Sequence, residues 1–490
     1  MKNVTIIGGG LSSLTASCYL AKKNFKVTIV EKNDHLGGRL SFFEKDGFVF
    51  DMGPSWYWMP EVFEDFFKDF DKDVSDYYNL KRLDPSYRFY LDDLIVDFSA
   101  DLNDIFKEFE KIEPGSSLKL SAFLDDAKIK YDISLQKFIL FPNKSIKEYL
   151  SIDVLKYFFK LDLFKSLRSH INNYFSNKKI KNFLEFPAMF LGGSPKNTPA
   201  LYSLMNYGDI KKGTWYPEGG MYKIAEAFSS LSKELGVEHI LGDPIVKLDI
   251  KNKSIKSAIS KSGKIFNSDY FLAGLEYPFV QTKLLDEKYR SYNSNYWSKK
   301  HVAPSALIFY LGLSSKVKNI EHHNLFFDKD FDKHLIEIFD NKVLPSEPLF
   351  YVCCPSKTDS SIVPNDDMEN IFILIPIGPG SEDSQSIRDK YFDQVINRME
   401  IITKQKIKNK IIVKKSFCVN DFVNRYNAYK GNAYGLANTL LQSAVFKPKI
   451  KDKIIRNLFY TGHFTVPGPG LPPAIISGKI ASNEILKDIK

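Results

Sequence analysis

The first thirty residues combine two patterns of apolar positions, which together predict a strand, a helix and a second strand. Residues 4–7 form a short β-branched run, as in a strand buried in a parallel sheet. Apolar side chains then recur at helical spacing over 11–21, which predicts a helix with one apolar stripe. A second apolar run over 26–30 returns to the sheet and is followed by Glu31.

The turn between the first strand and the helix is rich in glycine. Gly8 permits the tight turn, and Gly10 lets the backbone come close to a diphosphate. The N–H groups at the start of the helix, at Leu11 and Ser12, would face that group. Glu31 follows Gly10 by about twenty residues, the spacing of an acid that binds a ribose hydroxyl and disfavours NADP. The pattern predicts a dinucleotide site, and a glycine turn in another α/β unit is the alternative.

The segment after Glu31 favours a flavin over a nicotinamide cofactor. A second glycine pair, Gly37–Gly38, is followed by Arg39 and, shortly afterwards, by the run 53–55. A nicotinamide site has no use for these elements. An FAD that reaches a second domain does, because glycines let the chain pass close by and an arginine pairs with a phosphate or carboxylate. A plain turn is the alternative interpretation of the glycine pair.

The far end of the chain predicts a matching element. Residues 457–462 form a strand pattern that ends in glycine, and a proline-rich turn then precedes a predicted helix over 474–486. Proline is well tolerated in the first turn of a helix. Such a helix start binds anions or carbonyl oxygens, including the pyrimidine end of a reduced flavin. The two ends of the chain therefore build one site, with a substrate domain inserted between them.

These motifs resemble the amine oxidase and phytoene desaturase superfamily of flavoproteins. The run 8–10, Glu31 and the runs 36–39 and 50–54 match its two-part FAD motif. Runs at 213–221, 431–436 and 462–479 are similar to bacterial carotenoid desaturases in particular. The amine oxidase branch places an acid after the glycine of the last strand, whereas His463 stands here, as expected of the desaturase branch. A strand-end histidine with a satisfied hydrogen bond is the alternative role for His463.

The resemblance implies a phytoene desaturase with non-covalent FAD, which extends the conjugation of an acyclic carotenoid toward lycopene at the membrane that dissolves it. It also implies that the backbone of Val246 touches the adenine. The predicted cofactor residues are Gly8, Gly10, Leu11, Ser12, Ser13, Glu31, Lys32, Gly37, Gly38, Arg39, Gly53, Pro54, Ser55, Val246, Gly462, His463, Gly470, Leu471, Pro472 and Ala474. Ser13 takes the third glycine position, which governs helix–strand packing.

The chain has 490 residues, which predicts two joined domains. The expected fold class is α/β. A Rossmann-like FAD-binding domain, with a parallel sheet, helices and a small β-meander, comprises 1–75, 220–290 and 415–490. An inserted α+β domain for substrate binding and membrane association takes 76–219 and 291–414.

Charge and cysteine usage narrow the setting. The net charge of +9 suits anionic lipid headgroups, and neither a base-reading module nor a tight basic block points to nucleic acid. The four cysteines show neither pairing nor metal-ligand spacing, so we expect a reducing cytosol and no metal. With no recognisable signal peptide or membrane span, we expect a cytoplasmic protein, peripheral on the inner face of the cell membrane. The sequence leaves the oligomeric state open.

A hydrocarbon substrate calls for an apolar tunnel, because its affinity must come from buried apolar area. Candidate lining residues are Trp56, Tyr57, Trp58, Met189, Phe190, Met205 and Tyr207. The candidate proton acceptors are Glu185, Asp209 and Glu218, since a desolvated carboxylate has a raised pKa. Ordinary structural roles are the alternative for every one of these side chains.

The lysine-rich stretch 147–186 suggests amphipathic helices. Leu155, Phe158, Phe159 and Leu163 share a face, with Lys156 and Lys160 off it. Such a face rests on a membrane or packs into a core. The rival functions are another carotenoid desaturase, a ketolase or isomerase of the same family, an amine oxidase, and a non-enzymatic prenyl-binding protein similar to Rab GDP-dissociation inhibitors.

Overall fold

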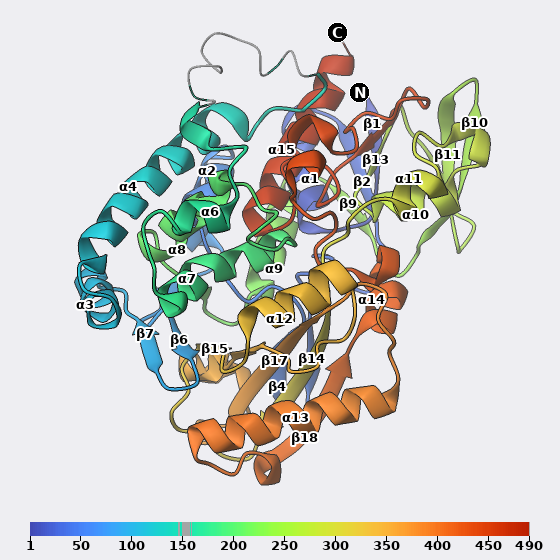
Figure 1. Cartoon of the computed structure of the whole chain (residues 1–490). Coiled ribbons are helices and arrows are strands. Elements are labelled where there is room, and N and C mark those ends of the chain that lie inside the picture. The colour runs from blue at the N-terminus through green and yellow to red at the C-terminus, as the bar shows by residue number, and fades with distance from the viewer. Residues whose placement is uncertain (146–147, 149–156, 158, 490) are drawn as a thin grey trace.

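The computed structural model describes residues 1–145, 148, 157 and 159–489, and a five-stranded parallel sheet lies near both termini (Figure 1). Its strand order is β19-β13-β1-β2-β9. The strands are β1 (Asn3–Ile7), β2 (Lys26–Val30), β9 (Glu238–Ile240), β13 (Tyr270–Ala273) and β19 (Leu458–Tyr460). Every neighbouring pair runs parallel. Both ends and the middle of the chain thus contribute to one sheet.

Three helices pack together beside this sheet. They are α1 (Leu11–Lys22), α9 (Tyr222–Glu234) and α15 (Leu471–Asp488), and they share one apolar core. A Cβ on Gly478 would lie 2.4 Å from the Ser12 carbonyl oxygen, so a glycine is needed where α15 crosses α1. Helix α15 begins at Leu471, three residues before the predicted start, because the proline pair fits into its first turn.

The predicted meander is confirmed. Strands β10 (Ile245–Lys251), β11 (Ser254–Ser260) and β12 (Ile265–Asn267) form a three-stranded antiparallel sheet. Together with the parallel sheet and its helices, it gives the α/β fold class that the sequence predicted.

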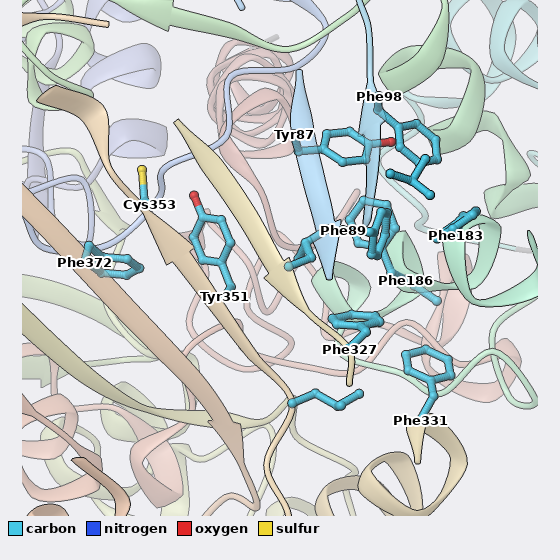
Figure 2. Packing of buried hydrophobic residues seen from close by; sticks show 14 of the residues in the cluster. Tyr87, Phe89, Phe98, Phe183, Phe186, Phe327, Phe331, Tyr351, Cys353 and Phe372 are labelled. Atoms are coloured by element: carbon cyan, nitrogen blue, oxygen red, sulfur yellow. The ribbon is translucent and has the colours of Figure 1, made fainter. Parts of the chain in front are cut away.

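A seven-stranded sheet forms the second large layer, with the order β18-β14-β17-β16-β15-β6-β7. Its strands are β6 (Tyr87–Tyr90), β7 (Ile95–Phe98), β14 (Ser305–Leu313), β15 (His323–Phe326), β16 (Phe350–Cys353), β17 (Glu369–Ile377) and β18 (Ile411–Phe417). Helix α13 (Gln385–Thr403) packs on one face. The opposite face carries a cluster of aromatic side chains, part of which Figure 2 shows.

In the part of the chain that the structure describes, further helices of 4 to 18 residues cover the rest of the molecule. The remaining helices of four or more residues are α2 (Pro60–Lys68), α3 (Leu102–Ile112), α4 (Ser116–Ile133), η2 (Ser134–Phe138), α6 (Leu167–Ile171), α7 (Lys178–Glu185), η5 (Phe186–Leu191), η6 (Ala200–Ser203), α8 (Leu204–Ile210), η7 (Val280–Leu284), α11 (Ser294–Ser298), α12 (Phe331–Leu335), η9 (Ile336–Asn341) and α14 (Val419–Tyr426). Two small ladders pair β3 (Phe42–Lys45) with β4 (Phe48–Asp51), and β5 (Leu80–Arg82) with β8 (Trp215–Pro217).

Only part of the predicted amphipathic stretch 147–186 falls within the described residues. Leu155, Lys156 and Phe158 lie outside the described residues, and Phe159 begins η4 (Phe159–Leu161), a single turn. Throughout the described ranges, no helix is both long enough and apolar enough to span a bilayer.

Candidate cofactor and substrate site

A cavity of about 880 Å³ is lined by both ends of the chain and by side chains of the seven-stranded sheet. On one side lie the turn after β1, the start of α1 and the start of α15. On the other side lie aromatic and aliphatic side chains from the inserted part of the chain. The carboxyl ends of the parallel strands therefore open onto an apolar chamber, which is where open α/β sheets bind ligands.

Most of the predicted cofactor residues meet at this cavity although they come from distant segments. Those that line it are Gly8, Gly10, Leu11, Ser12, Glu31, Lys32, Gly37, Gly38, Arg39, Gly53, Pro54, Ser55, Gly462, His463, Gly470, Leu471, Pro472 and Ala474. The fold of the chain itself therefore brings these residues together around one cavity.

Two predicted cofactor residues do not line the cavity. Ser13 is fully buried, and a Cβ on Gly274 would lie 1.9 Å from its Oγ, so Ser13 packs α1 against the end of β13. Val246 is 51% exposed and lies where the pairing of β10 with β11 shifts register. Val246 thus lies outside the cavity wall, and the predicted adenine contact of its backbone stays a prediction.

The start of α1 fits an anionic group. Gly10 caps the helix without a side-chain hydrogen bond, and a Cβ added there would meet nothing within 4 Å. Open space thus lies in front of the unpaired N–H groups and the positive end of the helix dipole. A diphosphate fits this position.

Glu31 is fixed at the cavity wall beside that turn. Its Oε2 accepts a hydrogen bond from the Gly9 N–H at 2.6 Å, and its Oε1 accepts one from the Asn33 N–H at 2.9 Å. Oε1 also accepts a hydrogen bond from Asn33 Nδ2 at 2.7 Å, so Oε2 is the oxygen that keeps capacity for a further donor such as a ribose hydroxyl.

Glu276 joins two predicted residues, and the sequence interpretation missed it. Its Oε1 accepts a hydrogen bond from Arg39 Nη2 at 2.7 Å and lies 2.9 Å from His463 Nε2. Burial alone would raise the pKa of Glu276. The charges of Arg39 and His463 and their hydrogen bonds outweigh burial and hold that pKa at about 2. A permanent carboxylate thus orients Arg39, whose buried Nε has no protein partner.

A signal for Glu276 existed in the sequence. It follows Gly274 just after the strand pattern over 269–273, and strand ends in α/β sheets supply ligand contacts. Nothing local in the sequence links it to Arg39, which lies 237 positions earlier.

The chamber beyond the cofactor turns is apolar. Among the predicted tunnel residues, Trp56, Trp58, Met189, Phe190 and Met205 line it. Tyr57 and Tyr207 do not: Tyr57 is buried with its hydroxyl 3.0 Å from that of Tyr78, and Tyr207 packs on Tyr131.

The charges on the cavity wall, as far as the structure describes it, all belong to the cofactor side. They are Glu31, Lys32, Arg39, Glu276, Arg425 and the titratable His463. Residues that line the apolar part include Phe186, Phe327 and Tyr351, which Figure 2 shows in the aromatic cluster. A long uncharged molecule fits this chamber better than an amine does.

The three predicted proton acceptors lie outside the cavity, and this corrects the prediction. Glu185 accepts a hydrogen bond from Arg168 Nε at 2.8 Å and is buried in that ion pair. Asp209 is buried and accepts a hydrogen bond from the Tyr87 hydroxyl at 2.5 Å. Glu218 is exposed to solvent. Local partners or solvent account for each carboxylate, so none is available to a substrate in the chamber.

Comparison with known proteins agrees with this geometry. The family model for flavin containing amine oxidoreductase matches residues 11–486. The chain is 37% identical to the carotenoid 3,4-desaturase of Haloarcula japonica, over 100% of this chain and 99% of that protein. It is 32% identical to a 4,4′-diapophytoene desaturase of Staphylococcus aureus over 99% of both chains. It is 29% identical to a zeta-carotene-forming phytoene desaturase of Myxococcus xanthus, over 99% of this chain and 94% of that protein.

Solved structures are similar at the level of fold. A putrescine oxidase variant superposes with a TM-score of 0.64 at 10% identity, covering 99% of both chains. A Rab GDI from Plasmodium falciparum superposes with a TM-score of 0.57 at 12% identity, covering 100% of this chain and 98% of that chain.

The family model and the sequence relatives together identify the chain. It belongs to the family of flavin-containing amine oxidoreductases, in its carotenoid desaturase branch, and is an FAD-dependent oxidoreductase.

Proposed function

We propose that this protein desaturates CH–CH groups of an acyclic carotenoid, with the conversion of phytoene toward lycopene as the first candidate. The observation that carries the proposal is the cavity itself, where cofactor turns border a chamber without charged side chains. When bound, FAD supplies the acceptor for a hydride from the substrate.

The protein's own residues would position the substrate. A carotenoid offers no charge or hydrogen-bonding handle, so its binding free energy comes from buried apolar surface, at about 25 cal/mol per Å². Trp56, Phe190 and Met205 supply such surface on the chamber wall. Rings and aliphatic groups there also exclude water from the reacting carbons.

We assign the cofactor domain to 1–75, 220–290 and 415–490, and the substrate domain to 76–219 and 291–414. The strands of the five-stranded sheet come from the first set, and those of the seven-stranded sheet come from 87–98 and 305–417. Strand β18 (Ile411–Phe417), at one edge of the seven-stranded sheet, runs past the boundary at 415.

A second candidate is the reaction that the relative from Haloarcula japonica is named for, 3,4-desaturation of a carotenoid. The chain is 37% identical to this relative over its whole length, compared with 29% to the phytoene desaturase from Myxococcus xanthus. Both candidates use the same cavity and differ only in where the substrate stops along it.

Expression in a host that makes phytoene, and separately in one that makes lycopene, tests both candidates. Red pigment from phytoene supports the first candidate. A longer-wavelength product from lycopene alone supports the second. If neither host changes its pigment although the purified protein retains FAD, both candidates are excluded. Protein that is colourless after gentle purification would favour a prenyl-binding protein, and hydrogen peroxide released from amines would favour an amine oxidase.

We further propose that the rim of the cavity rests on the cytoplasmic face of the membrane. Among the described residues, three large apolar ones both line the cavity and are exposed: Phe164 at 78%, Leu441 at 72% and Phe446 at 51%. Burying a side chain of this size in the apolar part of the membrane contributes about 1.5–3 kcal/mol to binding. Three such side chains can therefore anchor the rim of the cavity to the membrane surface. The net charge of +9 favours an anionic surface.

Sedimentation with anionic phospholipid vesicles tests the rim. The double variant Phe164→Ser/Phe446→Ser should leave most protein unbound, whereas Ile401→Ser should bind like the wild type. Ile401 is a fair control because it is 74% exposed on α13, a helix that does not line the cavity. Unchanged binding of the double variant would contradict the assignment.

A further inference from the structure

Desaturation removes a hydride and a proton, and the predicted carboxylates are not placed to take the proton. The described side chains of the apolar wall include four tyrosines with titratable hydroxyls: Tyr202, Tyr351, Tyr426 and Tyr434. Of these, Tyr351 is the one whose hydroxyl meets a histidine. It is therefore the candidate with a second group behind it to receive a proton.

The Tyr351 hydroxyl lies at the junction of the two halves of the cavity. Its Oη is 2.7 Å from Nδ1 of His323 and 2.9 Å from Oγ of Ser55. Ser55 lines the cavity beside the cofactor turn that contains Gly53. Figure 2 shows Tyr351 on β16 with its hydroxyl pointing the same way as the Cys353 thiol. Tyr351 and Ser55 both line the cavity, so their hydroxyl contact joins the apolar wall to the cofactor side.

His323 is held rigidly behind that hydroxyl. Its ring is fully buried and stacks on Trp56 with centroids 4.2 Å apart and an interplanar angle of 14°. Its Nε2 has no protein partner, so Nδ1 is the nitrogen that contacts Tyr351. Depending on the tautomer of His323, Tyr351 donates its proton to Ser55 or to the imidazole.

We propose that Tyr351 is the catalytic residue that accepts the substrate proton, and that His323 is the positioning residue behind it. This rests on the proposed desaturation. One C–H bond breaks, and its hydrogen leaves with the bonding electron pair as a hydride, for which FAD would supply the acceptor when bound. The adjacent C–H bond breaks, its electrons form the new C=C bond, and its proton moves to Tyr351 Oη as the proton of Tyr351 passes to His323 Nδ1. The substrate loses two electrons and FAD gains them.

An uncharged Tyr351–His323 pair suits the wall of an apolar chamber. Once the hydride has left, the adjacent C–H is strongly acidic, so a weak base is sufficient. An unpaired carboxylate at the same place would carry a large desolvation cost. Burial lowers the pKa of His323 well below 6.5, so the imidazole is neutral, and in its Nε2–H tautomer the lone pair of Nδ1 can accept the proton of Tyr351.

Tyr351→Phe tests the proposal because the ring and its packing remain. We expect kcat to fall about 100-fold or more, the usual contribution of general base catalysis, with KM and bound FAD unchanged. A substrate deuterated at the carbon that loses the proton should show a larger isotope effect in this variant than in the wild type. Tyr57→Phe is the matched control, since it also removes a buried hydroxyl–hydroxyl contact but lies off the cavity.

His323→Gln keeps a hydrogen-bonding side chain but cannot take up a proton at pH 7. We expect kcat to fall with KM unchanged, and carotenoid binding, followed by the shift of the carotenoid absorption spectrum, to match the wild type. A Tyr351→Phe variant with wild-type kcat would overturn the proposal, as would an equal loss in Tyr57→Phe. A wild type that holds FAD but oxidises no carotenoid would instead overturn the proposed function.

Discussion

The two halves of the cavity differ in how the chain forms them: local runs of sequence form the cofactor side, and tertiary packing forms the chamber side. The cofactor side is made of short runs that come from distant segments, but within each run, such as β1, its turn and α1, neighbours in sequence are also neighbours in space. The chamber side is assembled from side chains far apart in the chain, such as Trp56, Phe190 and Tyr351. The first half is polar and depends on backbone shape, whereas the second is apolar and depends on tertiary packing.

This contrast predicts different responses to mutation. A side chain added to the cofactor turns blocks a position that backbone geometry requires. A change in the chamber alters surface area or charge but leaves the cofactor side intact. FAD content and carotenoid turnover should therefore separate the two halves.

The largest effect is expected for Gly10→Val. The valine side chain would fill the open space in front of α1, where the diphosphate approaches. The purified variant should contain no FAD by its absorption spectrum, whereas Ser13→Ala, which faces Gly274, should remain yellow. A Gly10→Val protein with full FAD stoichiometry would refute the role of this turn.

Glu31→Ala should weaken FAD binding without abolishing it. Loss of hydrogen bonds to a charged group costs roughly 1.5–3 kcal/mol, or about 10- to 150-fold in the dissociation constant. Equilibrium titration of the apoprotein with FAD measures this. An unchanged dissociation constant would show that Glu31 only braces the Gly9 turn.

On the chamber side, Phe190→Glu should spare FAD and impair turnover. An unpaired carboxyl group in the apolar wall costs roughly 2 kcal/mol, or about 30-fold in kcat/KM for a carotenoid. Ile401→Glu, on the exposed face of α13, is the control. Equal loss of FAD and of turnover in Phe190→Glu would mean that the two halves are not separable.

A smaller, pH-dependent effect is expected at Glu276. Its pKa falls from an ordinary 4.5 to about 2 in the folded protein, so its ionised form stabilises the fold above pH 4.5. That contribution is lost as the pH falls toward 2. The difference in Tm between the wild type and Glu276→Gln should therefore shrink between pH 4.5 and 2. A difference that stays constant over this range would contradict the assigned ion cluster.

The strand, turn and helices that line the cofactor side could be predicted from the sequence because each of them is local. The strand, the glycine turn and Glu31 are readable within thirty residues, and the helix α15 is marked by its proline-rich start. The fold class followed from these elements and from the meander.

The proton acceptors could not be predicted in the same way. Glu185 looked available because its partner Arg168 lies 17 positions earlier with no motif to link them. His323 and Tyr351 are 28 positions apart on neighbouring strands, and only the pairing of β15 with β16 brings them together. Such contacts depend on register and packing, which spacing along the chain does not encode.

The central claim is that FAD lies against a chamber that holds an acyclic carotenoid. The most direct test mixes the purified protein with an acyclic carotene in vesicles without oxygen and follows the flavin absorption. We expect the oxidised flavin band to disappear while a carotenoid band at longer wavelength appears, in equal amounts. A flavin that stays oxidised with phytoene and lycopene but is reduced by an amine would contradict it.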